Sequence, residues 1–370
     1  MKRRDQHPAR SRHCAVAACI TSAIRVNGLL WFSATVVMAA EDVVIVSASS
    51  DRSQRIRKTG EIIDFTGQQL TLRTAGGGEL AIPSERVIDV LTFLGPDQRR
   101  ADQLLAARRF AEAAELYRQA QSREQRVWVR RRIVVQRVWC YRHLEQHDRA
   151  AELFLVLFQS DPSTQYIAAV PLGWRSQQPP ATLEHRAISW LRGSEDNRAD
   201  KHTNDSRDAM AALIGASWLL PTALRGESVS VLQQLRLHAN PTIARLSEAQ
   251  LWRSEIVTAT LQDVASWRSA LDELPRSLRA GPYFVIGQAL YRHGRHEEAA
   301  LLWMRVPILY PRQRALAGDC LLAAGNAMEK LNQFDEAGMI YREIVRDYPE
   351  LSTAGLAKSK LDLIQPRNDL

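Results

Sequence analysis

Apolar residues follow two different periods in two parts of the chain. Between residues 41 and 95 they alternate with polar residues, and this period of two predicts short strands at 43–46, 55–65, 69–74, 79–82 and 87–91. From residue 96 onward the apolar residues recur every three or four positions, which is typical of amphipathic helices. The sequence therefore predicts a small all-β unit followed by a mostly helical chain.

The helical part contains one pattern twice near its end. Four positions of the segment 287–311 recur 38 residues later: Gly287 with Gly325, Ala299 with Ala337, Trp303 with Tyr341, and Pro311 with Pro349. A constant offset indicates a repeated unit, here two helices joined by a turn. We expect the glycine and alanine to lie where the two helices of a pair cross. We expect the aromatic ring to fill the seam towards the next pair, and the proline to end the second helix.

Two more copies of the alanine and aromatic positions lie upstream, as Ala113 with Tyr117 and Ala150 with Phe154. A glycine, an alanine, an aromatic residue four positions later and a proline eight after that resemble the tetratricopeptide repeat (TPR), of the kind found in exported bacterial proteins. The resemblance implies antiparallel helix pairs that stack into a superhelix and bind other proteins. The last pair is similar to the repeats of envelope-assembly and Tol-Pal-associated coordinators.

The strand region resembles an SH3-like or Sm-like small barrel in the order of its turns and strands, as in the stretch 60–90. The predicted fold class is mostly α, a helical-repeat (TPR-like) superhelix preceded by a small all-β barrel domain. The predicted domains are a signal peptide, 1–40; a small β-barrel, 41–95; a TPR-like pair, 96–165; an irregular linker with a short helix, 166–205; degenerate helical repeats, 206–280; and a C-terminal TPR-like pair, 281–370.

The first 40 residues look like an export signal. Six lysines and arginines accompany an apolar run at 28–39, and Val37-Met38-Ala39 satisfies the small-residue rule for cleavage after Ala39 or Ala40. An uncleaved membrane anchor is the alternative, although a run of about a dozen apolar residues is short for a span that needs roughly 20. We therefore predict an exported protein, periplasmic or extracellular, that meets the membrane only through this segment if it is retained.

The charge of the chain is concentrated in that same segment. The whole chain has 49 basic and 41 acidic residues, a net charge of +8, of which 1–40 contribute six basic and one acidic residue, leaving +3. The densest basic stretch, 126–137, alternates arginine with apolar residues as a solvated helix face does. Nucleic-acid binding needs clustered positive charge. We therefore expect no nucleic-acid partner.

Residues suited to catalysis or metal binding are scattered. His143 and His147 have a helical i, i+4 spacing, but the repeat alignment places His147 at the turn between two helices. Cys140 and Cys320 lie in apolar helical surroundings, where we expect buried free thiols rather than a bridge. The local sequence contains neither a Ser-His-Asp nor a Cys-His arrangement. We predict no catalytic residue, no metal and no cofactor.

The remaining function is binding. Stacked helix pairs expose a surface built largely by the first helix of each pair. There Gln288 aligns with Asn326 and Arg292 with Lys330, and the two residues within each helix are four apart and so share a face. We call these four residues the polar ladder. We predict that they line a groove for an extended or helical peptide with acidic groups; an ordinary solvated surface is the alternative.

The sequence thus predicts a non-catalytic protein-binding scaffold, or adaptor, of the cell envelope. Two alternatives stay open. One is an enzyme or enzyme subunit with a site between the barrel and the repeats. The other is a structural protein that self-associates through its last helix, 353–364.

Overall fold

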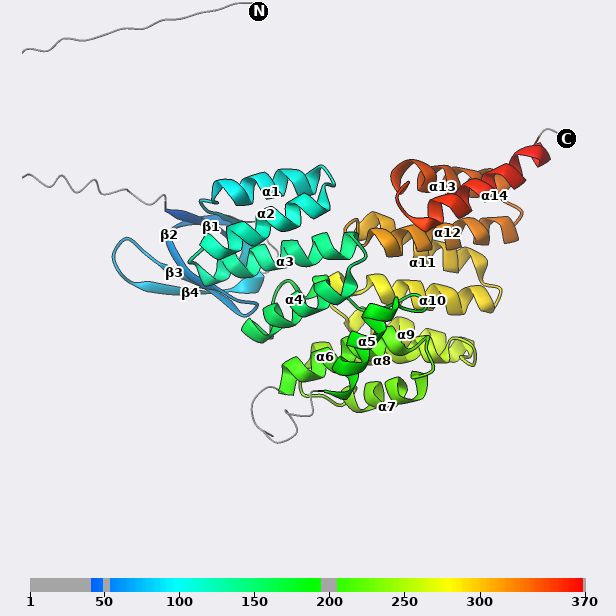
Figure 1. Ribbon diagram of the computed structural model, residues 1–370, viewed down its shortest axis with the longest axis horizontal. Coiled ribbons are helices and arrows are strands. Elements are labelled where there is room, and N and C mark those ends of the chain that lie inside the picture. The colour runs from blue at the N-terminus through cyan, green and yellow to red at the C-terminus, as the bar shows by residue number, and fades with distance from the viewer. Residues whose placement is uncertain (1–40, 49–53, 194–204, 369–370) are drawn as a thin grey trace, which may run out of the picture. The chain divides into compact units, whose positions relative to one another are not determined.

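The strands and helices follow the two periods of the sequence (Figure 1). The computed structural model describes residues 41–48, 54–193 and 205–368. The predicted export signal, 1–40, and residues 194–204 of the predicted irregular linker lie outside these residues. The part of the chain from Ala40 to Leu370 forms one compact unit, and everything below concerns that unit.

Five antiparallel strands form one sheet in the order β4-β3-β2-β1-β5, close to the predicted positions. They are β1 (Asp42–Ser47), β2 (Arg55–Phe65), β3 (Gln69–Arg73), β4 (Glu79–Pro83) and β5 (Val87–Leu91). The first half of β2 pairs with β1 and its second half with β3, and Gly60 stands where the pairing changes. A Cβ on Gly60 would lie 2.2 Å from the carbonyl oxygen of Arg73, so only glycine permits this approach. Among the described strands, the sheet order includes no pairing of β4 with β5 that would close a barrel.

Two helix pairs follow the sheet and pack in sequence. They are α1 (Pro96–Ala106) with α2 (Phe110–Arg123), and α3 (Val127–His143) with α4 (His147–Ser160). The sheet contacts α3, where Trp128 Nε1 donates to the carbonyl oxygen of Ile62 at 3.2 Å. Arg131 is buried there and donates to the carbonyl oxygen of Phe65 at 2.8 Å and to Asp64 at 3.1 Å. The prediction of a solvated arginine face is therefore wrong at Arg131, because the sheet, and not water, surrounds its guanidinium.

An irregular segment leads from α4 to the middle helices. These are α5 (Ala181–Arg192), α6 (Asp205–Leu219), α7 (Arg225–Leu235), α8 (Pro241–Glu255) and α9 (Leu261–Glu273). Arg253 of α8 fixes the irregular segment by donating to the carbonyl oxygens of Gly173 and Arg175 at 2.7 and 2.8 Å. Burial lowers the pKa of Arg253 to about 9. The Arg253 guanidinium thus supplies hydrogen bonds that this segment, which lacks regular secondary structure, does not form within itself.

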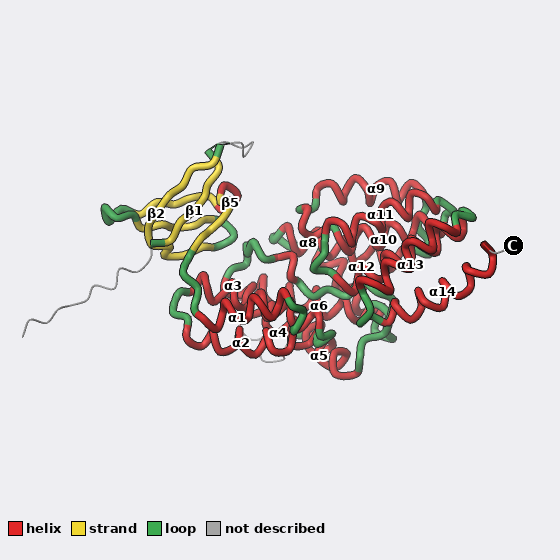
Figure 2. Tube along the Cα trace, turned by 90° about the horizontal axis from the view of Figure 1, so that it is seen from above, coloured by secondary structure: helices red, strands yellow, loops and turns green. Residues whose placement is uncertain are grey.

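The last five helices form the most regular part of the chain. They are α10 (Ala280–Arg292), α11 (His296–Leu309), α12 (Arg314–Lys330), α13 (Phe334–Asp347) and α14 (Ser352–Asn368). Figure 2 shows α10, α11, α12 and α13 side by side, each in contact with the next. The fold is thus a TPR-like helical repeat that follows a small antiparallel sheet.

The aromatic ring of each C-terminal repeat lies inside its own helix pair. Trp303 donates to the carbonyl oxygen of Phe284 at 3.1 Å, and a Cβ on Gly287 would lie 2.3 Å from Trp303 Nε1. A Cβ on Gly325 would lie 2.3 Å from a carbon of the Tyr341 ring. The expectation that these rings fill the seam towards the next pair is therefore wrong. The glycine of the first helix leaves the space that the ring occupies.

The alanines of the repeat pattern are all fully buried. They are Ala113, Ala150, Ala299 and Ala337, each 0% exposed. Tyr117 and Phe154, the aromatic residues of the two upstream copies, are buried to the same degree. Each alanine lies in the first turn of the second helix of its pair, because α2, α4, α11 and α13 each begin three residues before it. We therefore expect these positions to tolerate no larger side chain.

Candidate functional site

A cavity of about 440 Å³ between α8, α10 and α12 contains three of the four polar-ladder residues. Gln288 and Arg292 reach it from α10, and Asn326 reaches it from α12. The pattern brings these side chains together because they occupy the same positions of consecutive repeats. Lys330 is the last residue of α12; it is exposed and does not line this cavity.

The wall of this cavity combines cations with aromatic and aliphatic surface. Its cations are Arg225, Arg253 and Arg292, and no carboxylate is among its described lining residues. Arg225 donates to the carbonyl oxygen of Ser254 at 2.7 Å. Arg292 is exposed at the end of α10. Because carbonyl groups neutralise no charge, the cavity keeps a positive potential that favours acidic ligands.

Asn326 of the polar ladder is positioned by side chains of the neighbouring helices. The hydroxyl of Tyr341 lies 3.0 Å from Asn326 Oδ1 and 2.7 Å from Glu329 Oε1. Lys360 of α14 donates to the same Glu329 at 2.9 Å. A network that crosses three helices therefore orients Asn326, and loss of the Tyr341 hydroxyl would release it.

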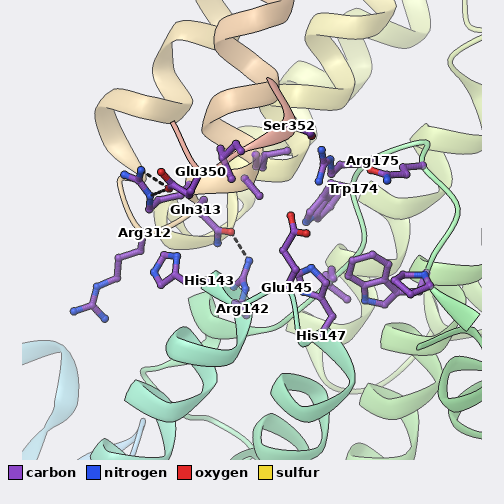
Figure 3. Close-up of a pocket in the computed structure, with 18 of the residues that line it drawn as sticks. Arg142, His143, Glu145, His147, Trp174, Arg175, Arg312, Gln313, Glu350 and Ser352 are labelled. Carbon is purple, nitrogen blue, oxygen red and sulfur yellow. Dashed lines mark hydrogen bonds and ion pairs between the residues drawn. The ribbon is translucent and has the colours of Figure 1, made fainter. Parts of the chain in front are cut away.

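A second cavity, of about 250 Å³, lies between α3, α4 and the start of α12 (Figure 3). His143, at the end of α3, and His147, at the start of α4, both line it. His143 stacks on Phe110 with ring centroids 4.4 Å apart, and His147 lies 4.7 Å from Trp218. Burial and neighbouring arginines lower the pKa of both histidines to about 4. Both rings are therefore neutral at pH 7.

Three arginines that line this second cavity are held by carboxylates, by the backbone or by an amide side chain. Arg314 pairs with Glu350 at 2.8 Å, and Arg175 pairs with Asp319 at 2.6 Å. Burial raises the pKa of Asp319 to about 6 in spite of that ion pair. Arg142 donates to the carbonyl oxygens of residues 168 and 170 and to the side chain of Gln313. These groups tie α3 to the start of α12.

Among the residues described, no group of three or more His, Cys, Asp and Glu side chains lies close enough to hold a metal ion. The described residues that line the second cavity all belong to helices and loops. This cavity is therefore not at the boundary between sheet and repeats, where the enzyme alternative places its site.

The two cysteines of the helical region are buried free thiols, as expected. Burial raises the pKa of Cys140 to about 12 and raises that of Cys320 as well. Both side chains therefore pack as small apolar groups.

Several arginines of these cavities could not be recognised in the sequence. Arg225 and Arg253 belong to helices outside the clear repeats, and Arg175 lies in the irregular segment, so no repeat alignment singles them out.

Residues 319–350 match the family model of the tetratricopeptide repeat. The match covers most of α12 and all of α13, and so includes Gly325, Ala337 and Tyr341. Repeats of this family generally mediate protein–protein interactions. No curated protein matches the chain.

In the described part of the chain, every helix is too short or too polar to cross a membrane.

Proposed function

We propose that this protein is a non-catalytic scaffold that binds a segment of a partner protein in the cavity between α8, α10 and α12. One observation carries the proposal: Gln288, Arg292 and Asn326, chosen from the repeat alignment alone, line a single cavity. The repeat geometry brings these residues together, and three arginines gather there with no carboxylate among the described lining residues, which favours a ligand site over an ordinary solvated surface.

The chemistry of the cavity favours an acidic segment with an apolar side chain. The guanidinium of Arg292 can pair with a carboxylate, and Gln288 and Asn326 can bond to a peptide backbone. Tyr291, Ile256 and Val257 supply the apolar wall. A volume of about 440 Å³ lies in the range, about 300–1,000 Å³, of pockets that hold small ligands. It can therefore accept a few side chains of a peptide.

We place this binding activity in the cell envelope, periplasmic or extracellular, on the sequence of residues 1–40. Fusing these residues to alkaline phosphatase, which is active only after export, tests the placement. Phosphatase activity in intact cells is expected. Activity no higher than that of an unfused cytoplasmic enzyme would contradict it.

Replacing the whole polar ladder by alanine tests the binding site. A matched control replaces Arg130 and Lys358, which are exposed on α3 and α14, away from the cavity. Partners crosslinked by the wild type in its native compartment should be lost by the ladder variant and retained by the control. Equal crosslinking by all three proteins would remove the proposal.

A second candidate function is self-association, and the surface of α14 favours it. Leu356 and Leu363 are 56% and 70% exposed, and their spacing of seven places them on one face of the helix. Light scattering tests this candidate through the mass of the full chain and of a variant with both leucines changed to serine. A monomeric wild type would exclude it.

A further inference from the structure

A groove of about 550 Å³ runs along α3 and shares no residue with the cavity of the proposed function. It lies between α1, α3 and residues 311–314, which precede and open α12. Four of its residues come from α3, at spacings of four, three and four along the helix: Arg132, Gln136, Trp139 and His143. These spacings place them on one helix face. The groove adjoins the cavity of Figure 3, with which it shares Phe110, His143, Arg312 and Arg314.

The groove has an excess of positive charge. Its cations are Arg108, Arg132, Arg312 and Arg314, and its one described carboxylate is that of Asp102. Asp102 accepts a hydrogen bond from Tyr117, and Arg314 is paired with Glu350. The other three arginines form no ion pair within the described part of the chain.

Arg312 is the most available of these cations. It is exposed, and its guanidinium lies 5.7 Å from the ring centroid of Trp139. Figure 3 shows its side chain turned away from Glu350. It can therefore meet a ligand without first breaking an ion pair.

The groove also offers apolar surface beside this charge. Leu105 and Phe110, both half-buried, line it together with the arginines. A peptide can cover this surface with its apolar side chains, whereas phosphate has no apolar part.

We propose that this groove binds an acidic segment of a partner protein, with carboxylates paired to Arg132 and Arg312 and an apolar side chain on the surface of Leu105 and Phe110. The length of the groove fits a peptide. The stripe from Arg132 to His143 spans eleven residues of α3, or about 16 Å at 1.5 Å per residue. An extended peptide covers that distance with about five residues. The scaffold would then hold two protein segments, one in each site.

Octaglutamate labelled with fluorescein, titrated with the full chain and followed by fluorescence anisotropy, tests this inference. Because Arg312 is exposed, Arg312→Glu should leave the fold intact and weaken binding by about tenfold. Arg132→Gln should weaken it by about two- to fivefold. Arg130→Glu is the matched control. It makes the same change of charge as Arg312→Glu on an exposed residue of α3 outside the groove, and should change affinity less than twofold.

Three results would overturn the inference. One is no saturable binding of octaglutamate by the wild type. Another is equal weakening by Arg312→Glu and Arg130→Glu. The third is displacement by inorganic phosphate at the same ionic strength as effectively as by unlabelled octaglutamate, which would mark a site for small anions. Because the polar-ladder cavity can also bind acidic peptides, the comparison is repeated in the polar-ladder variant. There Arg312→Glu should still weaken octaglutamate binding and Arg130→Glu should not, which separates this test from that of the proposed function.

Discussion

Replacing Gly325 by alanine should destabilise the protein, although alanine is the better helix former. In an open helix interior the change stabilises by about 0.5–1 kcal/mol. In α12 the new Cβ would lie 2.3 Å from one carbon of the Tyr341 ring and 2.7 Å from another. Carbon atoms pack best about 3.5–4.0 Å apart, so the ring would have to retreat by more than about 1 Å.

The ring of Tyr341 has no free space to retreat into. Its side chain is fully buried, and its hydroxyl is bonded to Asn326 and Glu329. Overpacking of this kind costs about 1–3 kcal/mol. After subtraction of the helix-propensity gain, we expect a net loss of about 1–2 kcal/mol.

Gly355→Ala is the matched control because it lies in α14, where an added Cβ meets no atom within 4 Å. It should stabilise by up to about 1 kcal/mol. Urea denaturation compares both variants with the wild type, and hydrogen exchange shows whether α12 and α13 open first. A Gly325→Ala protein as stable as Gly355→Ala would refute the packing argument.

Three further predictions concern buried polar groups and thiols. The pKa of His143 and His147 is lower in the fold than the ordinary value of 6.5, so the unfolded chain protonates first on acidification. The free energy of unfolding, measured in urea, should fall by roughly 2 kcal/mol per histidine between pH 7 and pH 5. A glutamine at either position should remove the contribution of that histidine to the fall. Cys140 and Cys320 should react with a disulfide reagent only after unfolding; reaction in the native state would contradict their burial. Arg131→Met should destabilise by about 2 kcal/mol in urea, since it removes the donor to the carbonyl oxygen of Phe65 and to the carboxylate of Asp64; an unchanged midpoint would contradict that contact.

The strands and hairpins could be predicted because their signals are local. The strands show a period of two positions and the helices a period of three to four, and both periods follow from backbone geometry alone. The helix pairs are marked by the spacing of a glycine, an alanine and an aromatic residue, which is also local in the chain. The place of Trp303 could not be predicted. It lies 16 residues after Gly287, as Tyr341 does after Gly325, but every pair of positions within a repeat recurs in this way, so the spacing does not tell which helix the ring contacts.

The groove along α3 could not be predicted because its parts meet only in the tertiary structure. Arg132 and Arg312 are 180 residues apart in the chain. The stripe on α3 is visible in the sequence, but nothing local brings residues 311–314 against it. The burial of Arg131 is similar, since it depends on the sheet that packs on the helix. Sequence periodicity thus predicts elements and their faces, but not which distant faces meet.

Photocrosslinking from position 257 in the native compartment tests the central claim most directly. A benzoylphenylalanine that replaces Val257, an exposed apolar residue of the cavity wall, keeps Arg292 and the rest of the polar ladder, and one that replaces Lys358 lies on the exposed surface of α14. We predict that a defined partner protein is captured from position 257 and not from position 358. Capture of no protein from position 257, or of the same proteins from both positions, would contradict the account.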